Sequence, residues 1–162
     1  MNFNKDSVFY KIYSIAALIL KKEGRVNPVA FLHTDNGVSL IEIEMPNTQR
    51  GKDALAAALR QMVKRQKAKM VVMVMEAWMA VPTPQESAYF HNEGVFPTAP
   101  SQHPQRKEIV LFSFQTPDET CSAFAVISRD QKNKPSIPDT PPVLETWPSD
   151  GRFGNLFKED TL

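Results

Sequence analysis

Apolar residues recur every three or four positions in two stretches of the chain, and this spacing predicts two amphipathic helices. The first is expected over residues 7–23, where Gly24 can take the left-handed conformation that ends many helices. The second is expected over residues 47–69. Its last turns are rich in Lys and Arg, which the helix dipole favours at a C-terminus.

Two further stretches show the pattern of strands joined by tight turns. Residues 27–46 contain two apolar runs separated by Asn36-Gly37, a pair that accepts the positive φ angles of a hairpin turn. Residues 107–129 contain two more runs, separated by the turn sequence PDET. We therefore expect two β-hairpins.

The most apolar stretch, MVVMVMEAWMAVP at residues 70–82, contains Glu76 as its one charged residue. Its valines and Trp78 favour a strand over a buried helix. Because both faces of such a strand are apolar, we expect it in the middle of the sheet, covered on both sides. If both helices pack on one face, the other cover must be the loop that follows, the C-terminal tail or a second copy of the protein.

The remaining two segments are rich in proline. Residues 82–106 contain five prolines, which predicts a long connection with little regular structure. The tail, residues 133–162, also contains five prolines, yet it keeps apolar residues that disordered tails usually lack. These residues, which we expect to dock on the domain or to bind a partner, are Trp147, Phe153, Leu156 and Phe157.

The fold class expected from these elements is α+β. Residues 1–132 are predicted to form a single domain, with a mostly antiparallel sheet of about five strands and two helices on one face. The tail follows this domain. A length of 162 residues suits one domain of this kind.

Charge and cysteine content narrow the classes of function. The net charge of +1 gives the whole molecule no strong attraction for nucleic acid or acidic lipid. The single cysteine, Cys121, excludes an intramolecular disulfide and a zinc site built on cysteines. The apolar run at residues 12–20 is about half the ~20 residues that a membrane span requires. It is followed at once by Lys-Lys-Glu, where a signal peptide would have its cleavage site. We therefore expect a cytoplasmic protein.

Glu76 has three interpretations. A buried carboxylate needs a partner, and Arg106 or Arg129 could supply a guanidinium group from a neighbouring strand. Alternatively, Glu76 marks the point where the strand leaves its cover. In the third interpretation Glu76 faces a pocket as a general base or a metal ligand.

The enzymatic alternative is a metal-assisted hydrolase. It would use Glu76 together with His91, Glu93 and His103, because imidazole and carboxylate groups are common ligands of zinc and iron. The spacing argues against it, since the chain contains no H-E-x-x-H motif. The G-x-S-x-G motif of serine hydrolases is also absent. We expect no cofactor.

A cluster of basic residues near the end of the second helix offers another alternative, nucleic-acid binding. The cluster consists of Arg60, Lys64, Arg65 and Lys67. Such a cluster is more often a solvated helix end, and no aromatic residue is interleaved with it in the sequence.

Two short motifs carry a resemblance to a known group of proteins. They are the run Glu76, Ala77 and Trp78 and, beyond the Pro-rich connection, the residues Pro104, Arg106 and Glu108. In this respect the chain resembles a group of small uncharacterised proteins of bacteria and their phages, in which an E-A-W strand precedes a P-x-R-x-E strand. The resemblance implies a prokaryotic or viral source and no particular activity. It also favours an ion pair between Glu76 and Arg106, since the motif contains both.

The function expected from the sequence is that of a small, non-catalytic interaction protein. Its partner would be another protein or a second copy of itself, with a homodimer as the simplest outcome. The exposed apolar residues expected in the tail support this, because such patches often mark protein–protein contacts. No membrane contact and no small-molecule ligand is expected.

Overall fold

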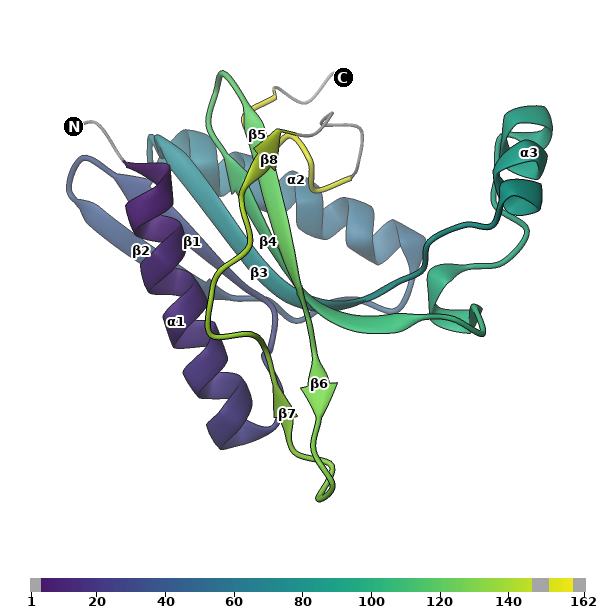
Figure 1. Cartoon of the computed structure of the whole chain (residues 1–162). Helices are drawn as coiled ribbons and strands as arrows, with labels where there is room; N and C mark the ends of the chain where they lie inside the picture. The colour runs from purple at the N-terminus through teal and green to yellow at the C-terminus, as the bar shows by residue number, and fades with distance from the viewer. Residues whose placement is uncertain (1–3, 147–151, 159–162) are drawn as a thin grey trace.

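The computed structural model describes residues 4–146 and 152–158, and its centre is a six-stranded antiparallel sheet with a helix on each face (Figure 1). The strand order is β2-β1-β3-β4-β5-β8. These strands are β1 (Val29–Thr34), β2 (Gly37–Glu42), β3 (Met70–Met79), β4 (Lys107–Gln115), β5 (Thr120–Val126) and β8 (Glu145–Thr146). A separate two-stranded ladder joins β6 (Ser128–Arg129) and β7 (Pro135–Ser136).

The helical elements are α1 (Lys5–Glu23), α2 (Gln49–Arg65), α3 (Pro84–Glu93) and the short 3₁₀ helix η1 (Pro100–Gln102). The α+β class and the antiparallel sheet predicted from the sequence are therefore confirmed. No helix within residues 4–146 and 152–158 is long and apolar enough to span a bilayer.

The prediction that both long helices lie on one face of the sheet is wrong. Side chains of β3 alternate between two separate cores, as the pleat of a strand requires. Val72 and Val74 belong to the core beneath α1, whereas Val71 and Met73 belong to the core beneath α2. The two helices thus supply both covers of the central strand, and its burial requires no second copy.

α1 begins and ends where its sequence provides caps. The Asn4 side chain accepts a hydrogen bond from the Ser7 amide at 3.1 Å, so the helix begins two residues earlier than the sequence pattern suggested. Gly24 ends it with φ 79°. Its buried face packs aromatic rings on β4, with Phe9 at 5.4 Å from Phe112, measured between ring centres.

The prediction of little regular structure in residues 82–106 is also wrong, because α3 lies there. Its start is a capping box in which the Thr83 hydroxyl accepts from the Glu86 amide at 3.2 Å and the Glu86 carboxylate accepts from the Thr83 amide at 3.2 Å. Pro84 fits the first helical position, where no amide donor is needed. No residue of α3 is buried, and the helix stands away from the sheet (Figure 1).

Parts of the C-terminal segment lie against the chain's own sheet. Ile137 is buried in the core beneath α1, where the Tyr13 hydroxyl donates a hydrogen bond to the Pro138 carbonyl. Leu156 is buried in the core beneath α2. Trp147, one of the residues predicted to bind a partner, lies outside the described residues.

Candidate functional site

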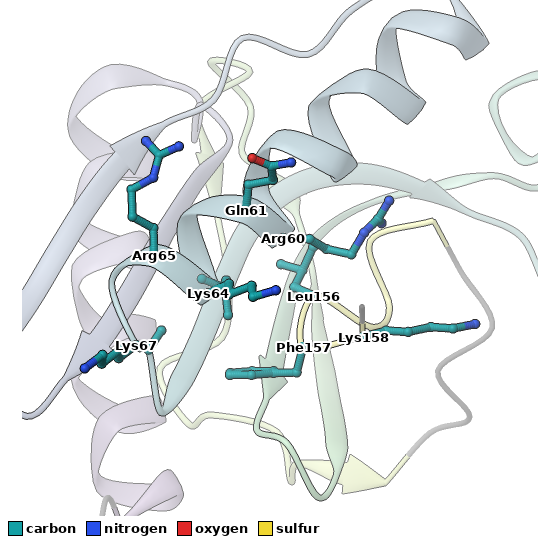
Figure 2. Close-up of a pocket in the computed structure, with 10 residues that line it drawn as sticks. Arg60, Gln61, Lys64, Arg65, Lys67, Leu156, Phe157 and Lys158 are labelled. Atoms are coloured by element: carbon teal, nitrogen blue, oxygen red, sulfur yellow. The ribbon is translucent and has the colours of Figure 1, made fainter. Parts of the chain in front are cut away.

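A groove of about 660 Å³ lies between the last turns of α2 and the C-terminal segment at residues 156–158 (Figure 2). We call it the basic groove. The residues that line it are Arg60, Gln61, Val63, Lys64, Arg65, Lys67, Ala68, Leu156, Phe157 and Lys158.

The floor of the basic groove is apolar and firmly held. Val63, Ala68 and Leu156 are all buried, with Leu156 only 1% exposed. The chain leaves α2 through a turn in which Lys67 has φ 54° and the Ala68 amide donates to the Val63 carbonyl at 3.0 Å. Since this turn is fixed to the floor, the backbone that carries Lys67 is held at the end of the groove.

The C-terminal segment at residues 156–158 forms the wall of the basic groove opposite α2. One buried side chain of β4 holds this segment in place. Gln115 is 1% exposed, and its carbonyl oxygen accepts a hydrogen bond from the Leu156 amide at 2.8 Å. Its amide nitrogen donates to the Phe153 carbonyl. Gln115 thereby holds the C-terminal segment on the sheet and brings Phe157 and Lys158 to α2.

The electrostatic character of the basic groove is one-sided. Among the described residues that line it, five are cationic and none is acidic, although the whole chain has a net charge of only +1. Among the described residues, no carboxylate forms a salt bridge with Lys64, Arg65 or Lys67. The attraction for an anion comes from these side chains alone, because the C-terminal end of a helix carries negative partial charge.

The cationic groups are spread along the basic groove. Figure 2 shows Arg60 and Lys158 extending on one side, Arg65 and Lys67 extending on the other, and Lys64 lying between α2 and Phe157. A single small anion would need these groups to converge on one point. The observed spread suits a ligand with several negative charges along its length.

The polar side chains of the basic groove are suited to binding an anion. Among the described residues they are Lys, Arg and Gln side chains, and no His, Cys, Ser, Asp or Glu lines the groove. Ammonium and guanidinium groups form charge-assisted hydrogen bonds with phosphate oxygens. The half-buried Phe157 ring adds a surface on which a planar group can stack.

The sequence identified part of this site. Arg60, Lys64, Arg65 and Lys67, the basic cluster noted for the second helix, all line the basic groove. Lys158 was missed, because nothing in the sequence links it to a helix that ends about ninety residues earlier. The aromatic neighbour that the cluster lacks in the sequence is supplied by Phe157 in three dimensions.

Three of the residues predicted to bind a partner have contacts within the chain itself. Leu156 is buried in the core beneath α2, and Phe153 and Phe157 pack partly against the same core. The side chain of Leu156 is thus inaccessible to a partner while the segment stays in place.

The predicted ion pair between Glu76 and Arg106 is absent among the described residues. Glu76 is exposed, and its carboxylate accepts a hydrogen bond from the Val26 amide at 3.1 Å. The guanidinium carbon of Arg106 instead lies 4.9 Å from the centre of the Trp78 ring, a cation–π contact. Glu76 sits where the strand leaves its cover, which was the second interpretation of this residue.

The nearby carboxylate that does bind an arginine is Glu108. It forms a bidentate pair with Arg129, with N···O distances of 2.9 and 3.2 Å. The hydrogen bond that the Arg129 guanidinium donates to the Glu108 carboxylate is the main reason why the pKa of Arg129 is raised above its usual value.

The residues of the hydrolase alternative do not come together. His91 and Glu93 are exposed on α3, whereas Glu76 is on β3. His103 is buried, and its Nε2 lies 3.0 Å from Glu86, a hydrogen bond that lowers the pKa of the Glu86 carboxyl. No group of three or more His, Cys, Asp or Glu in the described part of the chain could hold a metal ion.

No protein-family model, curated protein or solved structure matches this chain.

Proposed function

We propose that this protein is a non-catalytic nucleic-acid-binding protein that holds a single-stranded segment in the basic groove. The observation that carries the proposal is the meeting of five cationic side chains from two distant parts of the chain around an apolar floor, with no acidic residue among the described residues of the lining. The phosphate backbone of a nucleic acid is a polymeric anion that such a cluster can bind.

The aromatic wall favours a single strand over a duplex. In a duplex the bases are stacked inside, so the Phe157 ring could not stack on them. In a single strand the bases are free to stack on an aromatic ring while the backbone follows the lysines and arginines. A peptide made only of acidic residues would satisfy the charges but has no aromatic bases to stack on Phe157.

The test is binding of fluorescently labelled oligonucleotides, measured by anisotropy. We expect the protein to bind single-stranded DNA or RNA more tightly than a duplex of the same length, with little dependence on sequence. Phe157→Leu keeps an apolar side chain on the core but removes the ring. Stacking is worth about 1–3 kcal/mol per base, so this variant should bind roughly tenfold more weakly.

Competition distinguishes nucleic acid from acidic protein. Polyglutamate carries the same kind of charge without bases, and we expect it to displace a bound oligonucleotide only at much higher charge concentration. Equal competition, together with no effect of Phe157→Leu, would show that the basic groove binds acidic peptides and would contradict the proposal.

A further inference from the structure

The open edge of the sheet carries an apolar surface that lies on the opposite face from the basic groove. β2 pairs with β1 on one side only, and it ends the six-stranded sheet. Two of its side chains, Val38 and Leu40, are 55% and 59% exposed. Next to an unpaired strand edge, exposed residues of this type form a surface that invites pairing with another strand.

The pairing register places these two residues on the α1 face. Leu40 is opposite Phe31, and Phe31 packs partly against the core beneath α1. Val38 is opposite His33, two residues along the same strand and therefore on the same face.

α1 contributes apolar residues that face this edge. Its flank with Tyr13 is turned toward Pro138, which follows β7, beyond the β5 side of the sheet. Helical spacing puts Ile15 and Ile19 on the other flank, away from Pro138, and they are 49% and 38% exposed. We call the set Ile15, Ile19, Val38 and Leu40 the edge surface.

β2 lacks most of the features that usually protect an edge strand from pairing. Its sequence, GVSLIE, contains no Lys, Arg or Pro, the strand is six residues long, and its one charged residue, Glu42, is at its end. The opposite end of the sheet is closed by β8, which is only two residues long. The edge at β2, unpaired over the whole strand, is therefore a place where another strand can be added.

We propose that the edge surface binds a second copy of this chain through antiparallel pairing of the two β2 strands. The sequence of β2 is self-complementary about Ser39. With Ser39 opposite Ser39 of the second copy, each Val38 lies opposite a Leu40, so the apolar residues pair with each other. The same register sets Glu42 opposite Asn36, so that the two Glu42 carboxylates do not face each other.

A strand of another protein would need apolar residues at the positions opposite Val38 and Leu40. A second copy of this chain has them there, because the pairing is symmetric about Ser39. A two-fold axis through Ser39 also brings the apolar flanks of both α1 helices to the same side of the joined sheet. The basic groove, on the α2 face, stays open in such a dimer.

The experiment is measurement of mass in solution by light scattering coupled to size exclusion at micromolar concentration. The chain has a mass of 18.3 kDa, and we expect twice that value. Leu40→Lys should restore the monomer mass, while Val143→Lys, at a residue 81% exposed and outside the edge surface, should stay dimeric. Circular dichroism of each variant checks that the fold is kept.

A cysteine placed on the two-fold axis gives an independent readout. Ser39→Cys should form an intermolecular disulfide on mild oxidation, since directly opposed residues of paired strands lie within reach of each other. The native Cys121 is buried, and Ser128→Cys, exposed elsewhere, serves as the control that does not cross-link. A monomeric protein, or a dimer that survives Leu40→Lys and does not cross-link through Ser39→Cys, would overturn the proposal.

Discussion

The two halves of β3 differ in their surroundings, although both are apolar in sequence. Residues from Met70 to Val74 are all buried, because α1 covers one face and α2 the other. From Met75 to Met79 the strand is half-buried or exposed, and Glu76 and Trp78 meet solvent. An apolar run thus indicates a strand, but it does not show how far along that strand the cover extends.

The comparison explains why a carboxylate is tolerated in this run. Glu76 lies one residue beyond the half-buried Met75, where its charge keeps contact with water and its oxygen caps the Val26 amide. Trp78 is exposed too, and the guanidinium group of Arg106 covers its ring.

The largest expected difference in stability comes from replacing one methionine by alanine in each half of β3. Met70 is fully buried, so Met70→Ala should lower the free energy of unfolding by about 2–5 kcal/mol. Met79, at the other end of β3, is only half-buried, and Met79→Ala should cost less than about 1 kcal/mol. Urea unfolding of both variants measures the difference, and equal losses would show that the two halves are covered alike.

A second test concerns the half of β3 that both helices cover, Met70 to Val74. It measures how the stability of the fold depends on pH. His33 is opposite Met70, and its burial lowers the pKa of the imidazole below its usual value of 6.5. The unfolded chain therefore binds a proton that the folded chain rejects as the pH falls below about 6.5, so acidification should destabilise the fold.

The slope from this one group is at most about 1.4 kcal/mol per pH unit. Thermal melts of the native protein from neutral pH down to mildly acid pH should show the loss. His33→Gln should remove the slope in this range, whatever its effect on stability at neutral pH. A native protein whose stability rises as the pH falls through this range would contradict the buried, neutral state of His33.

The smallest expected change in the free energy of unfolding is that of a substitution in the less covered half of β3, Met75 to Met79. Glu76→Gln keeps a carbonyl oxygen that can accept from the Val26 amide, so it should change the free energy of unfolding by less than about 1 kcal/mol. Removing one member of a buried ion pair would instead cost about 3–5 kcal/mol. Chemical denaturation of this variant distinguishes the two cases, and a loss in the higher range would restore the interpretation as a buried pair.

The sequence was a good guide to local structure. The spacing of apolar residues located α1 and α2, and the apolar run with its valines located β3. Asn36-Gly37 indicated the first hairpin, but the two turn residues are Asp35 and Asn36, and of the predicted pair only Gly37 has a positive φ, 137°. α3 was missed because the prolines around it were interpreted as helix breakers. The signal was nevertheless present, since Thr83 and Pro84 followed by Glu86 form a typical capping box.

Two features depend on tertiary contacts that periodicity does not record. Periodicity shows that a helix has an apolar face but not which side of the sheet it covers, so α1 and α2 were placed together. Likewise, Phe157 and Lys158 reach α2 only because Gln115, buried on β4, binds the backbone near them. The basic cluster was visible in the sequence, but the groove that it lines was not.

The most direct test of the proposed function is the salt dependence of oligonucleotide binding for two variants matched in charge. Lys64→Gln with Lys67→Gln removes two charges from the basic groove, and Lys21→Gln with Lys22→Gln removes two from the end of α1. For a single strand, each lost phosphate contact reduces the slope of log K against log salt by about 0.7, so the groove variant should lose about 1.4. The α1 variant should keep the native slope, and equal slopes for both variants would contradict binding in the basic groove.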